Sequence, residues 1–98
     1  MICWSPRAKR RLLDCMQYIA VQSQDWPTVI CWRDKVYSAV EHLDDFPESG
    51  SIVRELNRVD IRQVFVGDYR IIYRVKRRVP EIISIRHGHF LIKSIHSL

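Results

Sequence analysis

With 98 residues, the chain is long enough for a single domain over residues 1–98 and too short for two. Its hydrophobic content of 47% is typical of a globular protein and excludes a disordered chain. The net charge of +5 is uneven: residues 61–98 carry eight Lys or Arg against two acidic residues, and residues 25–60 carry four against eight. The C-terminal part therefore predicts either a cationic face for an acidic partner, nucleic acid or protein, or a basic surface that serves solubility alone.

The cysteines and the absence of long apolar runs indicate the compartment. Cys3, Cys15 and Cys31 are odd in number and form no CxxC pair, which fits neither a disulfide framework nor a zinc site. No apolar run approaches about 18 residues, and the N-terminus lacks a signal-peptide pattern. We therefore expect a cytoplasmic protein without a membrane span.

The N-terminal half predicts two helices. Residues 1–4 are apolar and suit a short strand. Ser5 is a good helix cap and Pro6 a good first helical residue, and apolar residues then recur at helical spacing to about Val21. After a short polar break, Pro27 opens a second helix. Its apolar stripe is of the kind that faces a core and comprises Val29, Trp32, Val36, Ala39, Val40 and Leu43. The two helices should form an antiparallel hairpin.

From Ser51 onward the apolar period changes from helical to about two, which indicates strands. We expect strands over residues 52–56, 61–66, 69–76 and 81–87, with Gly67-Asp68 as a hairpin turn. The tail from His89 to Leu98 is expected to add a short strand or to cover a sheet edge. The prediction is an α+β fold in which the helical hairpin packs on a mainly antiparallel sheet of about four strands.

Strand alternation predicts which side chains share a face of this sheet. One face should carry Tyr69, Ile71, Tyr73 and Val75, and the other Arg70, Ile72 and Arg74. In the last strand, alternation groups Glu81 with Ile83 and Ile85, and Ile82 with Ser84 and Arg86. We expect the helices to cover the apolar face and the arginine-bearing face to be the working surface.

Several short motifs in this order resemble the RelE/ParE superfamily, the toxins of bacterial type II toxin–antitoxin systems. They are Trp4-Ser5-Pro6, Phe46-Pro47, Arg54-Glu55, Ile61-Arg62-Gln63, the run from Gly67 to Val75, and His87-Gly88. The opening Trp-Ser-Pro and the late Tyr69-Arg70-Ile71-Ile72-Tyr73 look most like the ParE, or plasmid-stabilisation, branch. The resemblance covers nearly the whole chain.

This resemblance implies a microbial RNase-like sheet beside a helical hairpin. It also implies a cytoplasmic toxin that is neutralised by a cognate antitoxin. ParE-type members act on DNA gyrase, whereas RelE-type members cut ribosome-bound mRNA. A third hypothesis is an inactive toxin-fold protein kept as a binding module.

RNA cleavage requires a base, an acid and cations that stabilise the phosphorane. The resemblance to RelE-type enzymes implies lysines, two arginines and a late tyrosine in these roles. Arg70 matches the motif arginine, but the lysine positions hold Ile61 and Gln63. The late arginine position falls at His89 or Phe90, and the tail has no tyrosine. A RelE-like mechanism is therefore not expected.

A YoeB-like nuclease remains the enzymatic alternative. Its acid–base groups would be Glu55 or Glu48, Arg70, and His89 or His87, with Phe90 as the nearby aromatic. The competing interpretation is structural, in which Arg70 and Arg74 pair with acidic side chains across strands. These acidic partners would be Glu55, Asp60 or Asp68.

The favoured hypothesis is a ParE-like inhibitor, in which no residue is catalytic and nucleic acid is not a partner. Candidate contacts to gyrase or antitoxin are Lys76, Arg77, Arg78 and Arg86. An acidic antitoxin segment would fold as it binds, with Trp26 or Tyr37 as anchors unless they pack internally. We expect no cofactor and no metal site, because His87, His89 and His96 have no second ligand cluster beside them.

Overall fold

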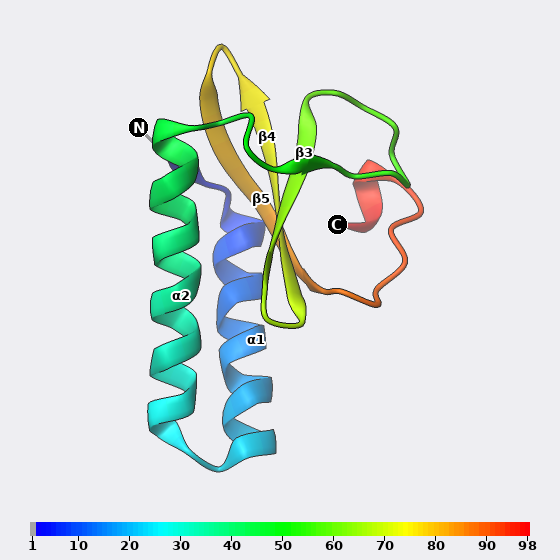
Figure 1. Ribbon diagram of the computed structural model, residues 1–98. Helices are drawn as coiled ribbons and strands as arrows, with labels where there is room; N and C mark the ends of the chain where they lie inside the picture. The colour runs from blue at the N-terminus through cyan, green and yellow to red at the C-terminus, as the bar shows by residue number, and fades with distance from the viewer. Residues whose placement is uncertain (1) are drawn as a thin grey trace.

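The computed structural model describes residues 2–98, so the Met1 end of the expected N-terminal strand lies outside the described residues. The elements are β1 (Cys3–Trp4), α1 (Pro6–Ser23), α2 (Trp26–Asp45), β2 (Ser51–Ile52), β3 (Ile61–Val66), β4 (Tyr69–Lys76), β5 (Val79–His87) and a short 3-10 helix η1 (Ile95–Ser97). Two long antiparallel helices lie on one side of a twisted sheet, and the C-terminal tail lies on the other (Figure 1). This confirms the α+β prediction.

The helical hairpin forms for the local reasons expected from the sequence. The Ser5 hydroxyl accepts a hydrogen bond from the Ala8 amide at 3.0 Å, and Pro6 occupies the first turn of α1. Gln24 adopts a left-handed conformation, φ 49°, that ends α1 and lets α2 begin two residues later. The Ser5 amide also donates to the Ile82 oxygen at 2.9 Å. The start of α1 is thereby attached to β5.

The sheet has five strands in the order β1-β5-β4-β3-β2, one more than expected. β1 joins the edge parallel to β5, and the other pairings are antiparallel. The expected strand over residues 52–56 is wrong, because pairing with β3 stops at Ile52. The amides of Leu56 and Asn57 both donate to the Val53 oxygen, at 3.1 Å each, which folds this segment into a turn.

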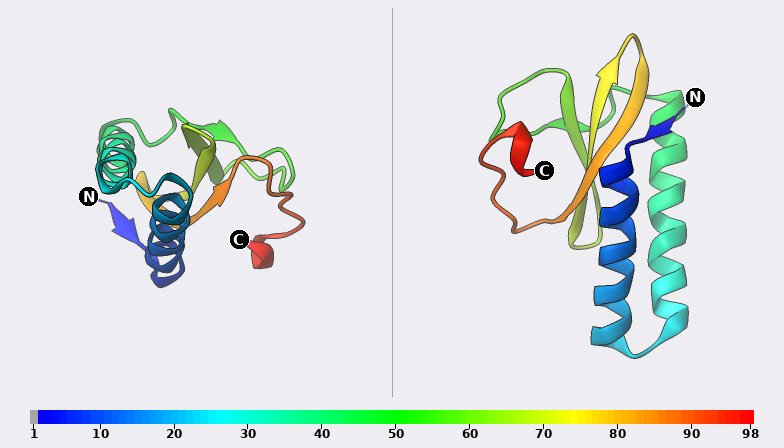
Figure 2. Two further views of the ribbon diagram at one scale, coloured as in Figure 1. Left: turned by 90° about the horizontal axis from the view of Figure 1, so that it is seen from below. Right: turned by 180° about the vertical axis from the view of Figure 1, so that it is seen from behind.

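The helices cover the face that carries Tyr69, Ile71 and Tyr73, as expected. Figure 2 shows both helices on this side of the sheet. The buried residues that pack here include Ala8, Leu12, Val36, Val40 and Leu43. The Tyr73 hydroxyl accepts a hydrogen bond from the Gly50 amide at 2.9 Å, so this buried phenol is satisfied.

The opposite face is a second core, and the expectation that it would be an open working surface is wrong. The buried residues Val53, Ile61, Ile72, Ile92 and Leu98 pack together there. The 53–60 segment and the tail cover this face, and the tail ends in η1 instead of a strand. A sheet face can serve as a binding surface only where nothing covers it, and here the chain itself does so.

A β-bulge also changes the faces predicted for β5. Ile72 pairs with Ser84 but Tyr73 pairs with Ile82, so Ile83 is an extra residue. Ile82 and Ile85 both reach the helix-covered core, whereas Ile83 packs in the second core. The predicted grouping of Ile83 with Ile85 is therefore wrong, because a strict period of two assumes an unbroken ladder.

Candidate functional site

Arg70, the central residue of the motif in β4, is buried at the boundary of the second core. Its side chain is only 5% exposed. Its guanidinium donates to Glu55 Oε2 at 2.8 Å, to Gln63 Oε1 at 3.0 Å and to the main-chain oxygen of Phe90. A longer bond of 3.4 Å reaches Glu55 Oε1. Arg70 therefore joins β3, the 53–57 turn and the tail.

The electrostatics of this cluster favour a permanent ion pair. The hydrogen bond from Arg70 holds the pKa of Glu55 below its ordinary value, despite partial burial of the carboxyl. The Ile92 amide also points at Glu55 Oε2, at 3.5 Å. A carboxylate with a lowered pKa and committed lone pairs is a weak proton acceptor. The arrangement thus matches the structural interpretation of Arg70 and Glu55.

The histidines of the nuclease hypothesis do not join this pair. His87 is the cross-strand partner of Tyr69, and the two ring centroids lie 5.5 Å apart on the helix-covered face. Arg70 projects from the other face. His89 is exposed, and its ring centroid lies 5.2 Å from that of His87. Within residues 2–98, neither imidazole shares a hydrogen bond with Arg70 or Glu55.

The remaining residues of the nuclease hypothesis are also dispersed. Glu48 lies in the loop after α2, where its main-chain oxygen accepts from Arg62 at 3.3 Å. The Phe90 ring lies beneath the Arg86 guanidinium, 3.9 Å from its carbon to the ring centroid. Asp60, one of the acidic partners considered for Arg70 and Arg74, instead binds Arg58 at 2.8 Å, and this hydrogen bond lowers the Asp60 pKa.

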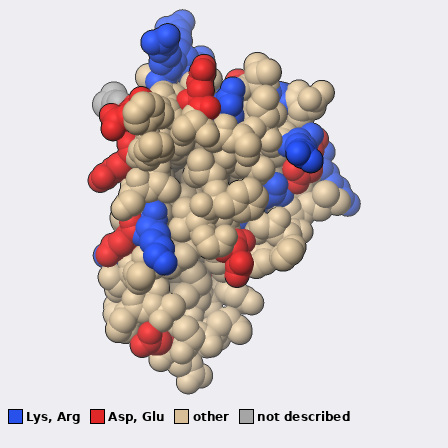
Figure 3. Space-filling model, in the orientation of Figure 1, with Lys and Arg blue, Asp and Glu red and all other residues tan. Residues whose placement is uncertain are grey.

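The β4–β5 turn presents three of the four candidate contact residues. Lys76, Arg77 and Arg78 are all exposed, and Figure 3 shows basic side chains gathered where this hairpin projects. Arg77 and Arg78 have positive φ values of 53° and 65°. A two-residue hairpin turn of this kind favours Asn or Gly, so the two arginines hold a conformation that is unfavourable for their type.

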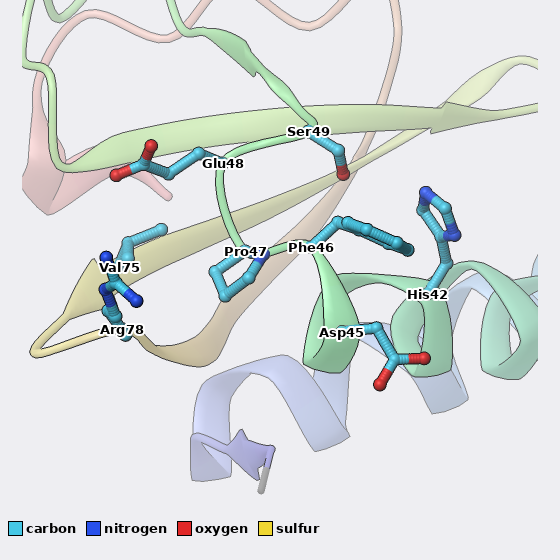
Figure 4. Close-up of a pocket in the computed structure, with 8 residues that line it drawn as sticks. All are labelled: His42, Asp45, Phe46, Pro47, Glu48, Ser49, Val75 and Arg78. Atoms are coloured by element: carbon cyan, nitrogen blue, oxygen red, sulfur yellow. The ribbon is translucent and has the colours of Figure 1, made fainter.

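A cavity of about 560 Å³ lies beside this turn. In Figure 4, Val75 and Arg78 lie on one side of the cavity, and His42 and Asp45 from the end of α2 lie on the other. Phe46 contributes an exposed apolar wall, 57% accessible. The cavity can receive a side chain that is apolar at its body and polar at its tip.

Arg86, the fourth candidate contact, lies apart from the turn. It donates to the main-chain oxygen of Ser97 at 2.8 Å and borders a recess with Arg7, Arg10 and Arg11 of α1. Burial and the neighbouring charges of Arg11 and Arg7 lower the Arg86 pKa. Sequence reasoning missed the three α1 arginines as site residues. Their only signal is clustering at the helix start, which does not reveal that β5 lies beside them.

Trp26 and Tyr37, the possible partner anchors, are 61% and 43% exposed. Tyr37 makes an edge contact with the ring of Trp4, with 6.0 Å between centroids. Among residues 2–98, no group of three or more His, Cys, Asp or Glu side chains is placed to hold a metal ion. In the same range, no helix combines the length and apolarity that crossing a bilayer requires.

Comparisons with known proteins identify a family by sequence and a matching fold by structure. Residues 2–91 match the family model described as "ParE toxin of type II toxin-antitoxin system, parDE". The fold matches a chain from a solved structure titled "Chromosomal ParDE TA system from P. aeruginosa", with a TM-score of 0.72 and 16% identity over 88% of this chain and 92% of that chain. No curated protein matches the sequence. Because the family model covers nearly all of the described residues, the chain belongs to the ParE toxin family of type II toxin–antitoxin systems.

Proposed function

We propose that this ParE-family protein acts in the cytoplasm as a toxin that inhibits DNA gyrase by binding it, without cleaving RNA, and that a cognate antitoxin neutralises it. The observation that carries the proposal is the buried Arg70–Glu55 pair. A catalytic arginine must offer free N–H donors to a developing charge. The terminal N–H groups of Arg70 are instead committed to Glu55, Gln63 and Phe90.

The proton-transfer groups support the same conclusion. A general base must lie within hydrogen-bond reach of its proton and have a pKa near the working pH. Glu55 has a lowered pKa, and His87 lies on the opposite face of the sheet. Inhibition by binding requires none of these groups, only an exposed surface.

The β4–β5 turn is the best candidate for the surface that contacts gyrase. It combines three exposed cations, Lys76, Arg77 and Arg78, with two residues held at positive φ. The hairpin turn requires positive φ at both positions, and two arginines there, in place of Asn or Gly, support a functional role for these side chains. The adjacent cavity beside Phe46 and Arg78 would receive an anchoring side chain of the partner.

An antitoxin segment that is acidic and folds on binding suits the remaining exposed features. Trp26 at the tip of the helical hairpin offers an apolar anchor. A small acidic reading frame beside the gene would identify the neutralising partner.

The discriminating experiment measures supercoiling by purified gyrase with increasing amounts of this protein. In parallel, mRNA integrity is followed in a translating extract. Inhibition of supercoiling with intact mRNA supports the proposal. Intact supercoiling with cleaved mRNA would favour the YoeB-like nuclease, whose Glu55 and Arg70 are in contact. No effect in either assay, with no growth arrest on expression, would favour an inactive binding module.

A charge-matched pair of variants tests the turn. The triple variant Lys76→Gln, Arg77→Gln, Arg78→Gln should weaken gyrase inhibition by about tenfold. The control removes three exposed lysines from scattered positions: Lys9, Lys35 and Lys93. Equal weakening in both variants would show that net charge, and not the turn, determines inhibition.

A further inference from the structure

The recess between α1 and the C-terminal tail concentrates positive charge. It has a volume of about 330 Å³ and is lined by Arg7, Arg10, Arg11 and Arg86, with His96 from the tail. Asp14 is the single acidic side chain among the lining residues. Figure 2, right, shows α1, β5 and the tail together on this side of the molecule. Four guanidinium groups against one acidic side chain leave an excess of positive charge among the side chains of this concave site.

Two of these arginines are already held in position. Arg11 donates to the main-chain oxygen of Leu98 at 3.0 Å, and Arg86 donates to that of Ser97 at 2.8 Å. The Arg86 guanidinium also lies over the Phe90 ring. Each guanidinium has about five N–H donors, and within residues 2–98 these hydrogen bonds use one donor of each group, so further donors remain for a ligand. Fixed guanidinium groups bind an oxyanion with less loss of side-chain entropy than mobile ones.

We propose that this recess binds phosphate groups, and that its natural ligand is the phosphodiester backbone of a nucleic acid. The stretch from Arg7 to Arg11 spans roughly 6 Å along the axis of α1. A ligand that pairs with these arginines must therefore carry several anionic groups in a row, as a nucleic-acid backbone does. Arginine pairs bidentately with phosphate oxygens. Gyrase is a DNA-bound enzyme, but the site does not depend on gyrase being the target.

The lining favours nucleic acid over an acidic protein segment. Protein interfaces have apolar cores, whereas nucleic-acid interfaces are polar and strongly positive. Leu98 is the only large apolar residue among those that line the recess. The cavity beside Phe46 and the Trp26 surface have the apolar character that a protein partner requires. The two kinds of surface therefore suit different ligands.

Binding is measured by fluorescence anisotropy with a labelled DNA oligonucleotide, an RNA of the same sequence and a polyglutamate peptide of equal charge. The variant Arg7→Gln, Arg10→Gln should lower oligonucleotide affinity by about tenfold and reduce the salt slope by about two. Both residues are exposed, so the fold should persist. The control Lys76→Gln, Arg77→Gln removes the same charge from the β4–β5 turn and should change affinity by less than about threefold.

Equal loss of affinity in the two variants would overturn the proposal, because it would indicate nonspecific attraction by net charge. Tighter binding of polyglutamate than of either oligonucleotide would also overturn it and assign the recess to an acidic protein segment. Competition between inorganic phosphate and the labelled oligonucleotide tests whether the recess is a site for a free phosphate ion or for a nucleic-acid backbone. Displacement of the labelled oligonucleotide by low millimolar phosphate would support a site for one free phosphate ion. Displacement by unlabelled oligonucleotide but not by phosphate would support a site for the nucleic-acid backbone.

Side-chain NMR supplies a readout that does not depend on overall charge. Oligonucleotide or inorganic phosphate should shift the Nε–Hε resonance of Arg86 in the wild-type protein. The shift should require about tenfold more oligonucleotide in Arg7→Gln, Arg10→Gln and less than about threefold more in the turn control. An Arg86 resonance that does not move at saturating oligonucleotide would contradict the proposal.

Discussion

Replacing Arg70 by methionine tests whether this arginine is structural. The change removes the charge and the bonds to Glu55, Gln63 and Phe90, while methionine fills much of the same volume. Breaking a buried ion pair costs about 3–5 kcal/mol of the free energy of unfolding. Glu55 keeps 25% of its side chain exposed and can turn toward water, so the lower limit applies.

A loss of about 3 kcal/mol should lower the melting temperature by roughly 12–24 °C in a domain of this size. Circular dichroism on heating and in urea measures both quantities. Arg54→Met is the control, because Arg54 is an exposed arginine in the same segment and should change stability by less than about 0.5 kcal/mol.

The double variant Arg70→Met, Glu55→Leu sharpens the test. Replacing both partners removes the unpaired carboxylate, so the double variant should be more stable than Arg70→Met alone. An Arg70→Met protein that melts within about 2 °C of the wild type would refute the structural role. If it also lost RNA cleavage in a translating extract, the nuclease hypothesis would replace the proposal.

Four further outcomes follow from individual contacts. The folded pKa of Glu55 lies below its ordinary 4.5, so the stabilisation from ionised Glu55 should be complete above pH 4.5 and should fall as the pH drops through the folded pKa. Urea titrations should therefore show that the free energy of unfolding decreases less with acid in Arg70→Met than in the wild type. Gly50→Ala should destabilise by about 1–3 kcal/mol in urea, because its Cβ would lie 2.5 Å from the Tyr73 hydroxyl. Ser84→Ala should melt at or above the wild-type temperature, since the buried Ser84 hydroxyl has no hydrogen-bond partner among residues 2–98. Burial raises the pKa of Cys15 to about 11, so mass spectrometry should find it alkylated more slowly at pH 8 than the two exposed cysteines.

Local sequence patterns were sufficient to predict much of the fold. The Ser5 cap, the Pro6 start and the helical stripes predicted both helices to within a few residues. The Gly67-Asp68 turn predicted the β3–β4 hairpin, and Gly67 does adopt a positive φ of 59°. These signals act over one or two helical turns or a single hairpin, so they can be recognised without knowing the rest of the structure.

Two features of the second sheet face could not be predicted in this way. The bulge at Ile83 breaks the period of two, and nothing in the run Ile82-Ile83 marks which residue is extra. The tail sequence predicts a short strand or a cover for a sheet edge, whereas in the structure it covers a sheet face. Its position depends on the second core, where Ile92 and Leu98 pack against Val53 and Ile72.

The sequence alone determined the class of fold, the resemblance to the toxin superfamily and the prominence of Tyr69-Arg70-Ile71-Ile72-Tyr73. Only the tertiary structure decided what Arg70 does. Its partners Gln63, Glu55 and Phe90 are 7, 15 and 20 residues away along the chain, and they meet only when the turn and the tail fold over the sheet. The same is true of the recess formed by Arg7, Arg11 and Arg86. Long-range packing places these charges together, because a guanidinium finds its partner by position in space and not by spacing in the sequence.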